Sequence, residues 1–322
     1  MAERVPPADL SRVRTVPLSQ RKNKVTVREF ARPVDPSRPL AEFLGGLSQV
    51  LGARVLRELA AAIVDAREGG RPVIWAMGAH GIKVGVSPVL IQMMEEGLVT
   101  GLVLNGAGAI HDWEIAAIGA TSEDVAAGLG RGQFGMAEET GRELNDAACE
   151  AADREEGLGE VLGRRIVAKL LPHRALSLLA RAFELGVPTT VHVAIGSDIV
   201  HQHPSASGSA IGAATFTDFR RLVTLVSELA GGVWINCGSA VQLPEVFLKA
   251  LSVAANLGHE GAAFSTANLD MIRHYRTEEN VLRRPTEGRG RTFSLTGHHE
   301  INVPLLAAAA LAERSHRPSR RG

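Results

Sequence analysis

Apolar residues recur along the chain in two alternating patterns. Short apolar runs, typical of strands buried on both faces, occupy residues 72–77 (PVIWAM), 101–104, 189–195, 232–236 and 261–265. Longer stretches with helical spacing cover residues 54–68, 88–96, 136–153, 174–185, 216–230, 243–257 and 301–312. This alternation predicts an α/β fold: a Rossmann-like, doubly wound, mostly parallel sheet with helices on both faces.

The regions outside this alternation lie at the two ends of the chain. Residues 1–38 are rich in proline and arginine with weak periodicity, and we expect an N-terminal arm there. Residues 314–322 are typical of a basic tail. Because no change of composition divides the remainder, we expect a single domain over residues 39–313.

Composition limits the class of protein. Apolar residues make up 45% and charged residues 22%, which is ordinary for a soluble globular chain. No run of 18 apolar residues occurs, and the N-terminus has no apolar core of a secretory signal. The two cysteines, Cys149 and Cys237, exclude a disulfide framework. We therefore expect a cytoplasmic protein that does not bind or cross a membrane.

The charges balance, with 35 basic residues against 35 acidic ones. This balance argues against a large nucleic-acid surface, which needs a basic excess. The basic residues are almost all arginines: only five lysines occur, the last of them Lys249. A reaction that needs a lysine amine therefore has few candidates, because arginine does not replace lysine in such chemistry.

Six polar turns rich in small residues follow the predicted strands or precede the last helix. They cover residues 78–85 (GAHGIKVG), 105–114 (NGAGAIHDWE), 196–209, 236–240, 265–270 (STANLD) and 296–300 (TGHHE). Ligands of open parallel sheets bind at the carboxyl ends of the strands. Small residues there let backbone amides approach a phosphate, so the turns predict a dinucleotide crevice.

Each motif by itself is weak. Gly106 to His111 matches the start of GxGxxG, but the third glycine is absent, as is an acidic residue about 20 positions later. Thr121 to Asp124 is more typical of a helix cap than of a ligand site. No nucleophile elbow or phosphate-binding P-loop occurs.

Histidines and two aspartates are the candidates for chemistry. Five histidines fall in the strand-end turns, namely His111, His201, His203, His298 and His299. His80 and His192 are placed nearby. Imidazoles suit proton transfer near neutral pH, and the His201-Gln-His203 pair leaves a metal site open as an alternative. Asp112 and Asp198, in glycine- or serine-rich turns, are candidate ligand contacts.

Taken in order, the turns resemble those of the deoxyhypusine synthase family. The resemblance covers residues 70–312 at low identity. It runs through GAHGIKVGVSPVLIQMMEEGLVTGLVLNGAGAIHD, GVPTTVHVAIGSDIVHQH, CGSAV, STANLD and VPLLAAAAL. The order and spacing of these segments are more specific than any one of them.

The resemblance implies a Rossmann-like NAD-binding fold in a homo-oligomer, a dimer or tetramer. Members oxidise the polyamine spermidine with NAD and transfer the resulting aminobutyl group through an active-site lysine. By position, NAD contacts would fall on Ala79, His80, Lys83, Gly106, Ala107, Gly108, Asp112, Gly238, Thr266 and Ala267. Asp112 and Asp198 would match acids that meet the cofactor or the amine.

The chain departs from the family where the catalytic lysine should lie. That region reads TEENVLRRPTEG, so Arg283, Arg284 or Pro285 takes the lysine position. An arginine stays protonated and cannot form the Schiff base. His111 and His298 replace two of the family's acids, one of them a ribose-binding aspartate.

Three hypotheses follow from these residues. The first is an NAD-dependent transferase or oxidoreductase acting on a small, polyamine-like amine without a lysine intermediate. In it, His111 or His298 would move protons, and Asp112, Asp198 and Asp270 would hold cationic groups. The second is another NAD- or metal-assisted reaction of the histidine-rich edge on an anionic substrate held by arginines. The third is a non-catalytic nucleotide-binding protein.

Overall fold

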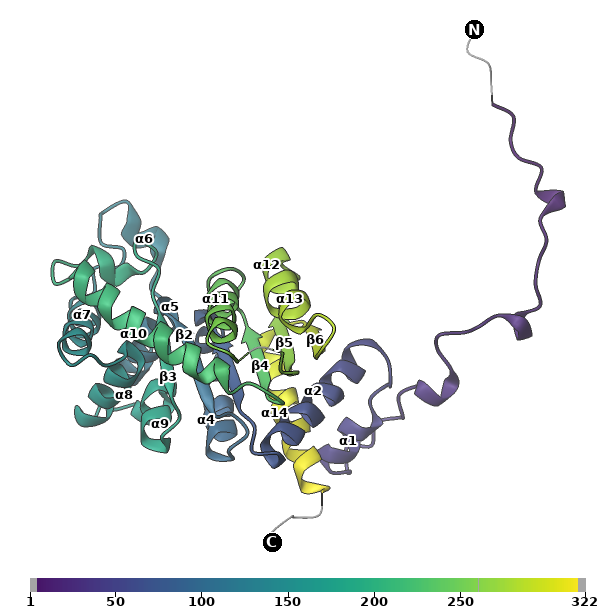
Figure 1. Cartoon of the computed structure of the whole chain (residues 1–322), viewed down its shortest axis with the longest axis horizontal. Coiled ribbons are helices and arrows are strands. Elements are labelled where there is room, and N and C mark those ends of the chain that lie inside the picture. Colours follow the sequence, from purple (N-terminus) through teal and green to yellow (C-terminus); the bar gives the residue numbers. More distant parts are fainter. Residues whose placement is uncertain (1–4, 260, 318–322) are drawn as a thin grey trace.

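The centre of the fold is one six-stranded parallel sheet with the strand order β3-β2-β1-β4-β5-β6. A computed structural model describes residues 5–259 and 261–317 of the chain (Figure 1). The strands are β1 (Val73–Met77), β2 (Gly101–Asn105), β3 (Thr189–His192), β4 (Val233–Cys237), β5 (Ser265–Asp270) and β6 (Arg291–Thr296). Every neighbouring pair is parallel, which confirms the predicted fold class.

Helices connect the strands and cover both faces of the sheet (Figure 1). Before β3 come α1 (Leu40–Gly46), α2 (Leu51–Glu68), α3 (Ala79–Lys83), α4 (Ser87–Glu95), α5 (Gly106–Ile118), α6 (Val125–Leu129), α7 (Glu138–Asp153), α8 (Leu158–Ala168) and α9 (Leu178–Leu185). After it come α10 (Gly208–Ser227), α11 (Gln242–Asn256), α12 (Tyr275–Thr277), a π-helical turn (Glu278–Arg283), α13 (Arg284–Thr286) and α14 (His299–Ser315).

The side chains of β1 alternate between two hydrophobic cores. Trp75 and Met77 belong to the larger core, which α2, α4, α5 and α14 help to form. Ile74 and Ala76 belong to the smaller core under α10 and α11. Because β1 is buried on both faces, its sequence is an unbroken apolar run rather than an alternation.

One predicted strand and one predicted turn are wrong. The sequence placed a strand at 261–265 and a turn at 265–270, whereas Ser265–Asp270 is the strand β5 and is buried throughout. Of its polar side chains, Asn268 is satisfied by residues of neighbouring elements, whereas Thr266 Oγ1 is buried without a partner among the described residues. Asn236 Nδ2 donates to Asn268 Oδ1 (2.8 Å), and Asn268 Nδ2 donates to Thr277 Oγ1 (3.3 Å).

Other elements were not predicted or were misplaced. The segment GAGAIHDWE is the helix α5 rather than a turn, and the strand β6 and the helix α8 lie where no element was expected. The segment Thr121–Asp124 contains a helix cap, as expected, but only Asp124 forms it: its side chain accepts the Ala127 amide and begins α6. Thr121 instead donates to Glu114.

The N-terminal arm leaves the body of the molecule beside α1 (Figure 1). Every residue from Val5 to Arg28 is exposed. At the root of the arm, backbone hydrogen bonds join Arg32 to Gly46 (2.9 Å) and Gln49 to Glu29 (2.8 Å). In the described part of the chain, no helix is both long and apolar enough to span a bilayer.

The free edge of β3 is closed by side chains of α10. Asp218 Oδ2 accepts the amides of Val191 in β3 and of Gly159 in α8, both at 2.9 Å. Thr215 Oγ1 donates to the Val191 carbonyl and accepts the Val193 amide, both at 3.0 Å. These bonds use the groups to which another strand would otherwise pair.

Burial makes Asp218 sensitive to pH. It raises the pKa of this carboxyl from 3.8 to about 7, against the bonds from Val191 and Gly159. The folded protein therefore holds a proton that the unfolded chain has lost between those pH values. This contribution to stability is complete below about pH 4 and disappears as the pH rises towards 7.

We predict that Asp218→Asn removes this pH dependence. An amide oxygen still accepts both backbone bonds, but it carries no charge to desolvate. The free energy of unfolding of the variant relative to the wild type should rise with pH between about 4 and 7, by up to about 1.4 kcal/mol per pH unit. Urea titrations at several pH values measure this difference, and a difference that does not change with pH would contradict the prediction.

Candidate active site at the carboxyl edge of the sheet

The strand order reverses between β1 and β4, and the turns that follow these strands meet. A Cβ on Gly78 would lie 2.5 Å from the Gly238 carbonyl oxygen, and Gly238 has a positive φ of 62°. Both positions therefore require glycine. In doubly wound sheets this switch point is where ligands bind, so the contact between the two turns locates the candidate site.

Two histidines pack edge to face at the switch point. The ring centroids of His80, in α3, and His299, at the start of α14, are 5.2 Å apart. His299 is buried and its Nε2 donates to the Leu269 carbonyl at 3.1 Å. Its Nδ1 is then an acceptor, and it has no hydrogen-bond partner among the described residues. The neighbouring His298 is exposed, with Nδ1 3.7 Å from a Glu300 carboxylate oxygen.

The Asp198 carboxylate lies against the N-terminus of α5. It is so near that a Cβ on Gly106 would collide with it, which explains the glycine there. Burial raises the pKa of Asp198 to about 6, opposed by bonds from the Ala107 amide and the Ser197 hydroxyl. Its Oδ2 atom is buried and has no partner among the described residues.

Three buried hydrogen-bond acceptors of this region have no donor among the described residues. Asp198 Oδ2, His299 Nδ1 and Asn236 Oδ1 lie in or next to the ends of strands, and none has a partner within residues 5–259 and 261–317. A buried acceptor without a partner costs about 1–3 kcal/mol. The arrangement therefore suits a ligand that brings donors, such as hydroxyl or ammonium groups.

Asp112 has a different position from the one expected. It lies on the buried side of α5, where its two oxygens accept the amides of Leu178 (2.7 Å) and Leu179 (3.1 Å) and the Ser177 hydroxyl (2.5 Å). Burial raises its pKa to about 6, against these three bonds. The carboxylate thus holds the N-terminus of α9, a structural contact that glycine-rich neighbours in the sequence did not indicate.

The remaining predicted cofactor residues divide between edge and interior. Ala79 and His80 begin α3 at the switch point, and Lys83 ends that helix with an exposed side chain. Gly106, Ala107 and Gly108 form the first turn of α5, where Asn105 Oδ1 already accepts the Gly108 amide at 2.8 Å. Thr266 and Ala267 are buried inside β5, because the strand begins later than predicted.

The other histidines do not converge on one point. His111 Nδ1 lies 2.5 Å from Thr121 Oγ1, which donates to Glu114, so this network lies along the outer part of α5. His192 is buried beside Thr190, and burial lowers its pKa to about 4. His201 accepts the Gly196 amide, whereas His203 bonds to Ser205. Within the described residues, no three metal-binding side chains gather in one place.

Asn236 is the residue of this edge that sequence reasoning did not single out. Its Nδ2 donates to the Ser239 carbonyl (3.0 Å) and to Asn268 Oδ1, whereas its own Oδ1 has no hydrogen-bond partner among the described residues. A polar residue directly at the end of an apolar strand was the available signal. His299, by contrast, was recognised only as one of several turn histidines.

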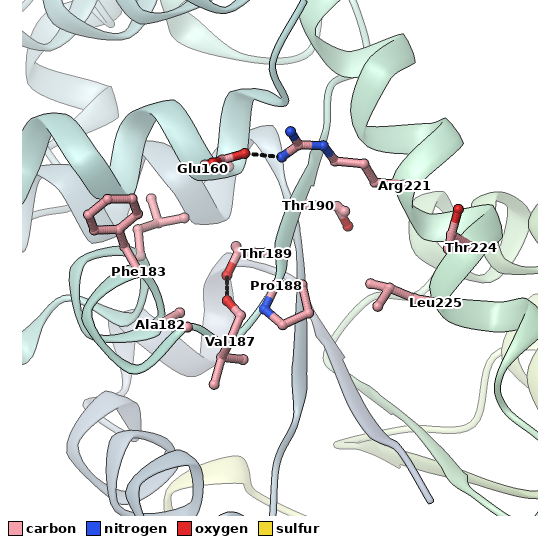
Figure 2. Close-up of a pocket in the computed structure, with 13 residues that line it drawn as sticks. Glu160, Ala182, Phe183, Val187, Pro188, Thr189, Thr190, Arg221, Thr224 and Leu225 are labelled. Carbon is pink, nitrogen blue, oxygen red and sulfur yellow. Dashed lines mark hydrogen bonds and ion pairs between the residues drawn. The ribbon is translucent and has the colours of Figure 1, made fainter.

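A separate cavity of about 460 Å³ lies beside the first half of β3 (Figure 2). Figure 2 shows Phe183, Val187 and Leu225 around it, with Glu160 and Arg221 paired across its rim. The residues of β3 that line it are Thr189 and Thr190, at the amino end of the strand, so the cavity is not part of the candidate site.

Comparisons with known proteins support the fold. No family model and no curated protein sequence matches the chain. Unliganded AgrE is similar in structure, with a TM-score of 0.51 and 12% identity over 84% of this chain and 34% of that one. ArgZ, an arginine dihydrolase of the cyanobacterial ornithine–ammonia cycle, has a TM-score of 0.50 and 13% identity over 82% and 32%. The chain therefore spans about one third of the length of these proteins.

A candidate deoxyhypusine synthase from Entamoeba histolytica also resembles the chain. Its TM-score is 0.49 at 11% identity, and the match covers 88% of this chain and 96% of that one. These are similarities of fold, and membership of the synthase family stays a prediction.

We predict that Asp112→Ala destabilises the protein. The substitution leaves the Leu178 and Leu179 amides and the Ser177 hydroxyl without their buried acceptor, which should lower the free energy of unfolding by about 2 kcal/mol or more. Urea denaturation measures the loss. Unchanged stability together with lost ligand binding would instead assign Asp112 to the ligand site.

Proposed function

We propose that the protein oxidises a small amine with NAD at the carboxyl edge of the sheet, without a covalent intermediate on an enzyme lysine. The observation that carries the proposal is the buried Asp198 carboxylate, whose Oδ2 has no partner among the described residues. A buried anion is costly unless a cation compensates it, and an ammonium group is a cation with three donors. The amine nitrogen would therefore bind at Asp198.

The residues of the switch point suit a dinucleotide that offers hydroxyl donors. Ala79, His80, Gly238, Ser239 and His299 would hold it, since His299 Nδ1 is an unused acceptor for a ribose hydroxyl. The α5 N-terminus suits its phosphates less well, because Asn105 and the Asp198 carboxylate already occupy it. When bound, NAD would supply a hydride acceptor for the carbon beside the amine nitrogen.

The protein's own residues would supply binding and proton transfer. Asp198 would hold the ammonium and could take its proton, because burial raises the pKa of this carboxyl to about 6. His80, half-buried at the switch point, is placed to exchange protons with solvent. Neither step requires a lysine.

The region of the missing lysine is consistent with release of the imine to water or to a free nucleophile. Arg283 forms an ion pair with Glu279, and Arg284 donates to Asn280 Oδ1 (2.7 Å). Both guanidinium groups are thus engaged beside the π-helical turn. An arginine would in any case remain protonated and could not form an imine.

One structural neighbour supports the choice of ligands. AgrE has been solved as a ternary complex with ornithine and NAD⁺, and that structure has a TM-score of 0.50 at 14% identity over 84% of this chain and 34% of that one. Ornithine is a small cationic amine. The chain corresponds to only one part of AgrE, so the reaction is proposed from the site of this chain.

We predict that Asp198→Asn weakens binding of the amine but leaves NAD binding intact. Loss of a charge-assisted hydrogen bond is worth about 1.5–3 kcal/mol, or about 10- to 100-fold in affinity. Calorimetric titration of NAD, followed by titration of a panel of small amines into the NAD complex, measures both affinities. Reduced nicotinamide absorbance reports turnover.

The matched control is Asp146→Asn, which makes the same change on the exposed side of α7 and should alter neither affinity. Absence of NAD binding at millimolar cofactor would refute the proposal. NAD binding without turnover of any amine would support the non-catalytic alternative instead.

A further inference from the structure

The zero net charge of the chain conceals two oppositely charged parts. Residues 5–38 contain eight arginines and lysines against three acids, a net charge of +5. Residues 39–317 contain 24 basic and 31 acidic residues, a net charge of −7. Because residues 5–28 are wholly exposed, the basic part is separated from the acidic body.

The arm is apolar as well as basic. Large hydrophobic side chains in it are more than half exposed: Val5, Leu10, Val13, Val16, Leu18, Val25, Val27, Phe30 and Val34. An isolated exposed hydrophobic residue is common, but a row of them on a segment that stands away from its own body marks an interaction surface. The composition of the arm therefore calls for a partner that is both apolar and acidic.

The body contains one region with that character. Residues 112–169 hold thirteen acids and six basic residues, so this region alone accounts for a net charge of −7. It includes a cavity of about 620 Å³ between the end of α5 and the α7 and α8 helices. Trp113, Ala117 and Ile118 supply its apolar lining. Glu123 and Glu139 are among its acids, whereas its Glu143 is already paired with Arg165 and Lys169.

Exposed hydrophobic residues surround this cavity. Ile118 lines it and is 71% exposed. Met136 precedes the lining residue Ala137, and Leu170 lies between Lys169 and Leu171, which also line it; both are exposed. The cavity beside β3 in Figure 2 is also apolar, but its acid Glu160 is already neutralised by Arg221, so it offers no charge complementarity.

The arm and the acidic cavity lie at opposite ends of the molecule. The arm begins beside α1 and runs away from the body, whereas α6 and α7 lie at the other end (Figure 1). A second copy brings an acidic cavity to the arm without requiring the arm to fold back across its own sheet. Two copies related by a twofold axis could exchange arms reciprocally.

We propose that the N-terminal arm docks into the acidic, apolar cavity of α5, α7 and α8 on a second copy of the chain. The arm supplies cationic side chains and a row of Val and Leu residues, and the cavity supplies carboxylates around an apolar floor. Contacts of this kind set the association rate and the choice of partner through charge, and depend on ionic strength.

The test compares full-length variants by mass in solution. We expect the wild type to be a dimer or larger assembly that dissociates as salt rises. Arg12→Glu with Arg14→Glu on the arm, and Ile118→Ser with Glu139→Lys on the cavity, should each weaken assembly by about 10-fold or more. Leu257→Ser with Glu228→Lys makes the same change at exposed positions elsewhere and should assemble as the wild type does.

Mixing the two defective variants separates docking from loss of folding. The arm variant keeps an intact cavity and the cavity variant keeps an intact arm, so the mixture should regain an assembly joined by one arm. Circular dichroism should show both variants folded. The proposal is overturned if the variants assemble like the wild type, or if the mixture stays monomeric.

Two further results would assign the arm a different binding partner and would also overturn the proposal. One is a monomeric wild type whose arm cross-links to its own cavity. The other is a monomeric wild type that binds vesicles of anionic lipid through the arm.

Discussion

The fold depends on how buried carboxylates satisfy the amides at helix N-termini around the sheet. Asp218 bonds to α8 and to the edge strand β3, Asp112 bonds to α9, and Asp198 lies against α5. Each carboxylate is desolvated, and its pKa is raised by burial. The positive end of a helix and its free amides compensate part of that cost.

The three carboxylates differ in whether an oxygen remains without a hydrogen-bond partner. This difference distinguishes a structural carboxylate from one that is available to a ligand. Asp112 has both oxygens bonded inside the protein. Asp218 uses Oδ2 twice and directs its other oxygen towards Gly157, near Arg221. Asp198 alone combines an unused buried oxygen with a position after the end of β3, at the ligand-binding edge. For this reason, Asp198 is the centre of the proposed amine site and Asp112 is not.

The distribution of charge between the N-terminal arm and the body of the protein also matters for function. A chain of zero net charge has no general electrostatic preference for anions or cations. The separation into a basic arm and an acidic body would nevertheless attract the arm of one copy to the body of another. Catalysis at the carboxyl edge and assembly through the arm would then use different surfaces of the same molecule.

The sequence by itself determined the fold class and most strands and helices. Runs such as PVIWAM are apolar because both faces of the sheet are covered, and that constraint is local enough to read. The prediction failed at STANLD, because the polar Asn268 in β5 is satisfied by Asn236 and Thr277, and Asn236 is distant in sequence.

The sequence also indicated the edge on which a site would form, since parallel strands bring their following turns together. Only the tertiary structure decided the roles of the side chains there. Asp112 and Asp198 look alike in sequence, each in a turn of small residues. The partners of a buried carboxylate come from other helices, so whether an oxygen remains free for a ligand depends on packing that no local pattern records.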